Sequence, residues 1–184
     1  MKTFKNKNNL GKISCITMAA VTCVSLTGCR TKAEDIMTPL KNGKYEEAAS
    51  KYDEADWSDN EKEEFKKQLR EYLSQIVTDY AAGTMTYEDA KSTIATISDM
   101  QVQKMDEDVA TASGSITALY ASKTAYENGL SELENSNYTE AMEYFKKVIE
   151  TDCYYEDANK KIEEAEALQY SKLKTEMLEE AEEN

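Results

Sequence analysis

A four-residue pattern, Tyr followed by two mostly acidic residues and Ala, recurs in this 184-residue chain and restricts its fold more than any other feature. It occupies Tyr45–Ala48, Tyr87–Ala90, Tyr138–Ala141 and Tyr155–Ala158. The acidic residues suit the first turn of a helix, where the helix dipole favours negative charge. The tyrosine and the alanine share one helix face, and the small alanine lets a neighbouring helix approach closely. The pattern therefore predicts helical hairpins that use one module several times.

Apolar residues at helical spacing mark the individual helices. The clearest stripe consists of Phe65, Leu69, Tyr72, Leu73, Ile76, Val77 and Tyr80. It follows a capping-box pattern from Ser58 to Glu61 and ends at Gly83, a typical C-terminal cap. Because the chain has one proline and six glycines, it lacks the turn residues that a sandwich or a barrel needs. We therefore expect an all-α fold.

The same spacing predicts the remaining helices. We expect them over residues 34–42, 45–55, from 86 onward, from about 106 to 134, 138–150 and 155–180. The segment Ser113–Gly114–Ser115 is a candidate kink or break. The last helix carries a stripe that should face inward, made of Ala158, Ile162, Ala165, Leu168, Leu173 and Met177. Residues 34–184 are thus expected to form a single helical domain.

The first 28 residues have the features of an export signal. Four lysines and no acidic residue precede the uncharged stretch from Ile13 to Gly28. A basic start followed by a short apolar run is typical of a secretory signal. The run has 16 residues, whereas a membrane-spanning helix needs about 20. We expect residues 1–28 to be removed from the mature protein.

The end of this stretch, Leu26-Thr27-Gly28-Cys29, resembles a bacterial lipobox. The resemblance implies cleavage before Cys29 and lipidation of its thiol, with residues 29–33 as lipidated N-terminus and linker. Two or more acyl chains anchor a protein stably, whereas one chain binds reversibly. The mature chain would then be attached to the outer face of the cell membrane without spanning it. The alternative is an ordinary signal peptide with a chance cysteine.

The composition of the mature chain excludes several functions. Its 156 residues carry 18 basic and 36 acidic side chains, a net charge of −18, which argues against nucleic acid as a partner. There is no histidine, no metal-ligand cluster and no phosphate-binding glycine loop, so we expect no metal and no cofactor. Cys153 is expected to be a semi-buried turn residue rather than a redox centre. Carboxylate pairs are too frequent for any one to indicate acid–base catalysis, and we expect a protein that is not an enzyme.

The segment from Ala125 to Cys153 resembles a tetratricopeptide repeat. The repeat-like segment as a whole is expected to span residues 122–153. The residues that carry the resemblance are Gly129, Tyr138, Ala141 and Phe145. Asn128, Glu132 and Cys153 depart from the family pattern, and the Tyr-to-Tyr spacings are not constant. The resemblance implies tetratricopeptide-like helical hairpins of the right-handed superhelix type, irregular rather than regular. The whole chain looks like a small lipoprotein of a Gram-positive cell envelope.

These features favour a membrane-anchored module that binds a protein or peptide of the cell envelope. The repeat resemblance implies a groove on the inner faces of the first helices of the hairpins, such as residues 116–134. Tyr154, Tyr155 and Tyr170 are the tyrosines left available for a partner. Two alternatives remain: an accessory or ligand-binding lipoprotein of a transporter or wall enzyme, and a structural helical spacer. A lysozyme-like hydrolase with two carboxylates is disfavoured, because no glutamate stands out as its acid.

Overall fold

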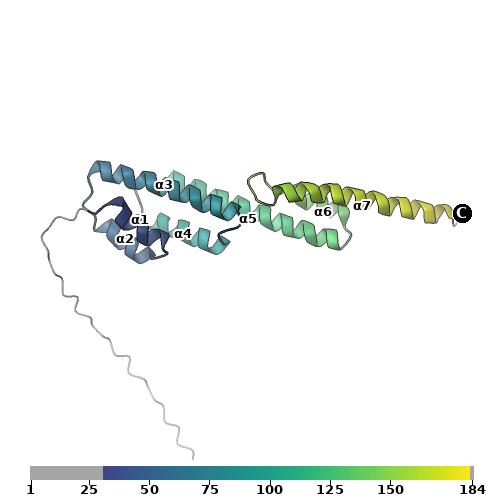
Figure 1. Ribbon diagram of the computed structural model, residues 1–184, viewed down its shortest axis with the longest axis horizontal. Coiled ribbons are helices and arrows are strands. Elements are labelled where there is room, and N and C mark those ends of the chain that lie inside the picture. The colour runs from purple at the N-terminus through teal and green to yellow at the C-terminus, as the bar shows by residue number, and fades with distance from the viewer. Residues whose placement is uncertain (1–30, 183–184) are drawn as a thin grey trace, which may run out of the picture.

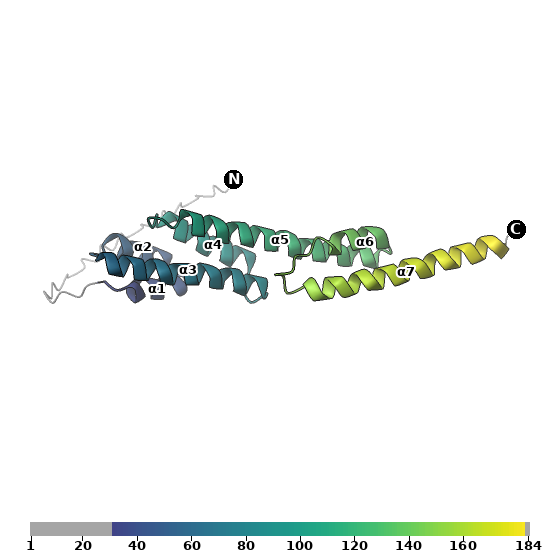
Figure 2. The same cartoon turned by 90° about the horizontal axis from the view of Figure 1, so that it is seen from above.

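The computed structural model describes residues 31–182, which form seven helices and no strand (Figure 1). The helices are α1 (Ala33–Lys41), α2 (Tyr45–Asp53), α3 (Asp59–Ala81), α4 (Tyr87–Asp99), α5 (Asp106–Glu134), α6 (Tyr138–Phe145) and α7 (Tyr155–Glu182). The predicted all-α class is confirmed. Both views show an elongated molecule in which α5 runs through the middle (Figures 1 and 2).

The larger part of the molecule, here named the N-terminal bundle, consists of α1–α4 and residues 106–119 of α5. One continuous core fills it, and Ile36, Leu40, Leu69, Ile76 and Ile116 are among its most deeply buried side chains. The stripe predicted for α3 supplies much of this core, although Tyr72 and Val77 are only partly buried. The helical spacing of apolar residues thus translates directly into packing.

The smaller part, the C-terminal hairpin, consists of residues 122–134 of α5, α6 and residues 155–169 of α7. Its main buried cluster consists of Ala141, Phe145, Val148 and Ala158, with half-buried side chains around them. Gly129 of α5 faces the ring of Phe145, and a Cβ atom at Gly129 would lie 2.6 Å from Phe145 Cε1. The absence of a side chain at Gly129 therefore lets α5 and α6 pack closely.

Helix α5 joins the two parts without interruption, so the expected kink at Ser113–Gly114–Ser115 is wrong. The hydroxyl of Ser115 donates to the carbonyl of Thr111, and that of Thr117 donates to the carbonyl of Ser113. These bonds to the preceding turn accommodate the hydroxyls within the helix. A continuous rod of 29 residues results.

Helix α6 ends at Phe145, five residues before the predicted end at Glu150. After Phe145 the backbone amides of Lys147 and Val148 bond three residues back, which tightens the chain into turns. The amide of Ile149 then donates to Ser122 Oγ of α5 at 3.1 Å. A side chain from another helix therefore takes the amide that would have continued α6.

The C-terminal end of α7 has no partner helix among residues 31–182. Every residue from 170 to 182, here named the α7 arm, is exposed, and both views show α7 continuing beyond α5 and α6 (Figures 1 and 2). Of the stripe predicted to face inward, only Ala158 and Ala165 are buried and Ile162 is half-buried. The prediction is wrong for Leu168, Leu173 and Met177, because α6 is too short to cover them.

Candidate functional site

An open groove runs along α4, loop residues 101–105 and residues 106–117 of α5, with a volume of about 470 Å³. Buried apolar side chains form its floor, and small side chains form its walls. The floor includes Ile94, Ile97, Val102, Met105 and Ile116, and the walls include Ala95, Ser98, Ala110, Ser113 and Thr117. We refer to it as the α4–α5 groove. It falls within the roughly 300–1,000 Å³ typical of ligand sites.

The two ends of the α4–α5 groove carry opposite charges. The loop of residues 100–105 joins the end of α4 to the start of α5. The ring of Tyr87, at the start of α4, lies 4.2 Å from the ring of Tyr120 between centroids, so the two helices run antiparallel. At the Tyr87 end of the groove, the Lys91 ammonium lies 5.6 Å from the centre of the Tyr87 ring. At the other end lies Asp106, the first residue of α5. An occupant therefore meets a cation at one end and an anion at the other.

Polar contacts fix α4 on the side away from the groove. Thr86 caps the helix by accepting a hydrogen bond from the Asp89 amide at 3.1 Å. The buried hydroxyl of Thr93 donates to the Asp89 carbonyl and is hydrogen-bonded to the Tyr45 hydroxyl of α2 at 2.9 Å. The bond between Thr93 and Tyr45 ties α4 to α2, while residues elsewhere on α4 line the groove.

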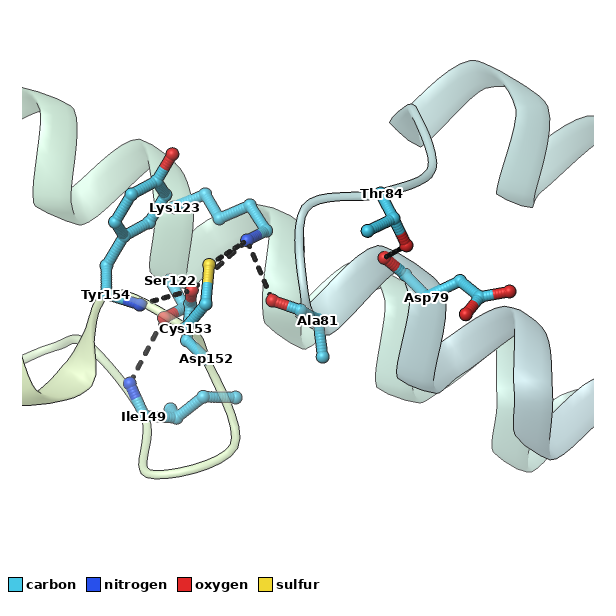
Figure 3. A network of polar contacts seen from close by, with 9 residues as sticks. All are labelled: Asp79, Ala81, Thr84, Ser122, Lys123, Ile149, Asp152, Cys153 and Tyr154. Atoms are coloured by element: carbon cyan, nitrogen blue, oxygen red, sulfur yellow. Dashed lines mark hydrogen bonds and ion pairs between the residues drawn. The ribbon is translucent and has the colours of Figure 1, made fainter.

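A second polar cluster, the Lys123 junction, connects the N-terminal bundle to the C-terminal hairpin (Figure 3). The Lys123 ammonium donates to the Ala81 carbonyl at 3.2 Å, to Asp152 Oδ1 at 3.1 Å and to Cys153 Sγ at 3.3 Å. The lysine side chain is 14% exposed and the carboxylate of Asp152 is fully buried. The amide of Tyr154 also donates to Asp152 Oδ1 at 3.1 Å.

The Lys123 junction keeps its lysine charged. Burial lowers the pKa of the Lys123 ammonium, but the hydrogen bonds and charges of Asp152 and Cys153 outweigh that effect, so its pKa lies above the ordinary value. The ring of Tyr154 lies 4.8 Å from the ammonium and adds a cation–π contact. The cluster closes the end of α3 onto the α6–α7 loop.

Within the C-terminal hairpin, the phenol of Tyr126 has a strongly raised pKa. The hydroxyl of Tyr126 donates a hydrogen bond to Asp157 of α7, and its ring stacks on Tyr154 at 4.5 Å. Burial, followed by the hydrogen bond to Asp157, raises the pKa of Tyr126 to about 12. The phenol therefore stays protonated at neutral pH and joins α5 to α7.

The structure places the residues singled out in the sequence as follows. The lipobox residues Leu26, Thr27, Gly28 and Cys29 lie outside the described residues. The repeat-like residues Gly129, Ala141 and Phe145 meet at the α5–α6 contact, and Tyr138 begins α6.

One expectation about sites is corrected, and one stays a prediction. Cys153 lies in a turn, as predicted, but it is exposed rather than semi-buried, because only its neighbour Asp152 points inward. The α4–α5 groove lies along residues 101–117, of which only Ile116 and Thr117 fall in the range 116–134, so a binding surface over 116–134 stays a prediction. The signal that could have indicated the α4–α5 groove is the row of Ala, Ser and Thr side chains at helical spacing in the first half of α5.

Two properties of residues 31–182 and the comparisons with known proteins complete the description. No helix in this range is long and apolar enough to cross a membrane. No group of three or more His, Cys, Asp or Glu side chains in this range is arranged to hold a metal ion. Comparison with protein-family models, with curated proteins and with solved structures finds no match to this chain.

Proposed function

We propose that this protein is a lipid-anchored lipoprotein of the extracytoplasmic membrane face that binds another envelope protein through its α4–α5 groove. The observation that carries the proposal is the groove itself, which has an apolar floor, small-residue walls and opposite charges at its ends. Grooves of this kind accept the apolar face of a helix from a partner. The occupant is therefore a helical segment of a protein or peptide.

The chemistry of the groove favours binding over catalysis. Its lining contains two formally charged side chains, Lys91 at one end and Asp106 at the other. Because the two groups lie at opposite ends of the groove, they cannot act together as acid and base. We therefore propose a protein that is not an enzyme, requires no cofactor or metal, and has neither nucleic acid nor metal as a partner.

The proposed anchor rests on the lipobox sequence from Leu26 to Cys29. The described chain begins at Thr31, beside the N-terminal bundle, so an anchor at Cys29 would attach the end of the molecule that carries the groove. Anchoring raises the local concentration of partners in the same membrane. The source of such a sequence is proposed to be a Gram-positive bacterium.

The anchor is tested by the substitution Cys29→Ala. We expect the variant to leave the membrane fraction, or to accumulate as uncleaved precursor, because the thiol that accepts the lipid is gone. Cell fractionation and metabolic labelling with a fatty acid measure both effects, and Cys153→Ala serves as the control that keeps its label. Labelling that persists without Cys29 would refute the lipobox assignment.

We further propose that the C-terminal hairpin is a single tetratricopeptide-like unit. In support, α5 and α6 pair closely at Gly129, and Ala141 and Phe145 are buried between them. In this proposal the unit extends the molecule away from the groove and stabilises α5. A structural spacer is the second candidate function, favoured by the elongated shape that the continuous α5 imposes.

The two candidates are separated by photo-crosslinking in cells. A photoreactive amino acid replaces Ala110, which is exposed in the groove wall, or Ala118, which is exposed on the same helix outside the groove. We expect a protein adduct from position 110 and none from position 118. Ser98→Trp, which fills the groove, should abolish the adduct. Equal adducts at both positions, or none at 110, would contradict the proposal and favour the spacer.

A further inference from the structure

A small pocket, here named the Trp57 pocket, lies at the end of the N-terminal bundle away from the α7 arm. It is formed where the end of α2, the first turns of α3 and the loop between α4 and α5 meet (Figure 1). Its volume is about 190 Å³. Because sites for drug-sized ligands measure roughly 300–1,000 Å³, this pocket has room only for a small molecule.

Three aromatic side chains line the Trp57 pocket. The ring of Phe65 lies 5.5 Å from the ring of Tyr52 and 5.3 Å from the ring of Trp57, measured between centroids. The rings of Tyr52 and Trp57 are 6.2 Å apart. Phe65 is buried, whereas Tyr52 and Trp57 are half-buried. The cluster therefore offers ring surface against which a flat apolar group can pack.

Two lysines of α3, Lys62 and Lys66, line the same pocket. Lys62 is exposed, whereas Lys66 is only 8% exposed, and its ammonium donates to Glu63 Oε1 at 2.9 Å. The side chain of Glu63 is 66% exposed and does not line the pocket. Because an ammonium has three donors, the Lys66 side chain can bind a further acceptor in addition to Glu63.

The lining of the Trp57 pocket differs in charge from the other hollows of this acidic chain. The chain carries 36 acidic and 22 basic side chains. Asp106 lines the α4–α5 groove, and three glutamates line the hollow between α1 and α3. By contrast, no aspartate or glutamate of residues 31–182 lines the Trp57 pocket, so both of its charged lining residues are cations.

Uncharged hydrogen-bond donors accompany the two lysines. The indole Nε1 of Trp57 is buried and has no acceptor among residues 31–182. Buried N–H groups of native proteins are normally paired. The exposed side chains of Gln101 and Gln103 also line the pocket and carry amide donors. A ligand that brings a carboxylate would therefore supply an acceptor for donors of several kinds.

We propose that the Trp57 pocket binds a small organic anion of the aromatic carboxylate class. The flat ring of the ligand packs against Tyr52, Trp57 and Phe65, and its carboxylate accepts hydrogen bonds from Lys62 and Lys66. Hydrogen bonds between ionised groups are roughly twice as strong as neutral ones, so the site prefers the anion to an uncharged molecule of the same shape. The inference does not depend on the proposed partner of the α4–α5 groove.

Benzoate is the probe that tests this site, and Trp57 is the reporter, because it is the single tryptophan of the chain. Fluorescence excited selectively at tryptophan and titration calorimetry both follow binding to the full-length chain at fixed ionic strength. Benzamide keeps the ring but lacks the charge, whereas acetate keeps the charge but lacks the ring. We expect benzoate to bind saturably, and benzamide and acetate to bind at least tenfold more weakly.

Two results with these probes would overturn the inference. If benzoate and benzamide bound equally, the lysines would not select an anion. If benzoate gave no saturable signal by either measurement, the pocket would not be a site for an aromatic carboxylate.

Lysine variants locate the bound anion. Lys62→Gln and Lys66→Gln should each weaken benzoate binding at least fivefold, because each removes one cation from the pocket. The matched control is Lys67→Gln, which removes an exposed lysine of the same helix that does not line the pocket and should leave the affinity unchanged. Equal losses in all three variants would indicate a general charge effect and overturn the inference.

The exposed position of Lys62 keeps the test independent of folding. Replacing Lys62 leaves the buried core in place, whereas replacing the buried Lys66 also removes its bond to Glu63. A loss of benzoate binding in both variants supports the site. A loss confined to Lys66→Gln would indicate a folding effect and overturn the assignment.

Discussion

The N-terminal bundle and the C-terminal hairpin are built from the same kind of helix but are held together differently. In the bundle, five helical segments surround one continuous apolar core. In the hairpin, a cluster of four buried residues is supplemented by polar bonds of Tyr126 and Ser122 between its own segments, and Lys123 joins it to Ala81 of the bundle. The comparison shows that apolar burial stabilises the bundle, whereas the hairpin depends on a few specific contacts and on its attachment to the bundle.

This difference implies that the hairpin opens while the bundle stays folded. Regions with few buried contacts open at lower free energy than the global unfolding reaction. We expect native-state hydrogen exchange to show weaker protection in α6 and α7 than in α3, with α5 divided near Lys123.

Removing the lysine of the Lys123 junction should have the largest effect. Lys123→Met leaves the buried carboxylate of Asp152 without its cation, and breaking such a pair costs about 3–5 kcal/mol. Urea unfolding at pH 7 measures the loss. The control Lys51→Met removes an exposed ion pair with Glu47 and should cost less than about 1 kcal/mol. Similar small losses in both variants would show that the junction does not couple the two parts.

Truncating the bundle core should come next. Ile76 is fully buried in α3, and Ile76→Ala should lower the free energy of unfolding by about 2–5 kcal/mol. Because the hairpin depends on the bundle, we expect the amides of both parts to lose protection together. Hydrogen exchange measures this loss of protection. If the hairpin amides stayed protected while the bundle amides lost protection, the hairpin would not depend on the bundle.

A glycine pair on α5 compares the two parts within one helix. In Gly129→Ala the added methyl would meet the Phe145 ring at 2.6 Å, so we expect a loss of about 1–3 kcal/mol confined to the hairpin. Gly114→Ala has open space around its Cβ and should stabilise the chain by about 0.5–1 kcal/mol. Thermal unfolding and hydrogen exchange distinguish the variants. Equal effects would mean that the α5–α6 contact is looser than described.

Alkaline pH should act on the hairpin through Tyr126. Its pKa is raised in the folded chain from 10.0 to about 12, so its contribution to stability is complete below pH 10 and is lost as the pH rises through about 12. We expect Tyr126→Phe to flatten the fall of unfolding free energy over this range. The control Tyr170→Phe, in the exposed arm, should keep the native slope.

The sequence predicted the features that depend on neighbouring residues. The all-α class follows from composition and spacing, and the capping box appears as the Ser58 amide donating to Glu61 at 2.8 Å. The starts of α4, α6 and α7 at a tyrosine also agree with the repeated pattern. These features need only local backbone geometry and the helix dipole.

The features that the sequence did not predict depend on contacts between distant residues or on the absence of a covering segment. Helix α6 ends early because Ser122 takes the Ile149 amide, a contact across 27 positions. The apolar stripe of α7 stays exposed at Leu173 and Met177 because periodicity identifies a face but not whether anything covers it. The α4–α5 groove was not predicted, because hairpin resemblance does not specify which helix pair leaves a hollow between them.

The direction of α7 determines how the molecule would bear a mechanical load. α7 begins beside the Lys123 junction and runs outward along α6 to the free end (Figure 2). A pull on the arm along its axis therefore loads the α6–α7 contact in shear, so that its contacts resist together rather than one after another. The load then passes through Asp152 and Lys123 to the end of α3. A chain tethered at one end and pulled at the other would transmit tension along the continuous α5, and the ion pair of Asp152 with Lys123 would share that load.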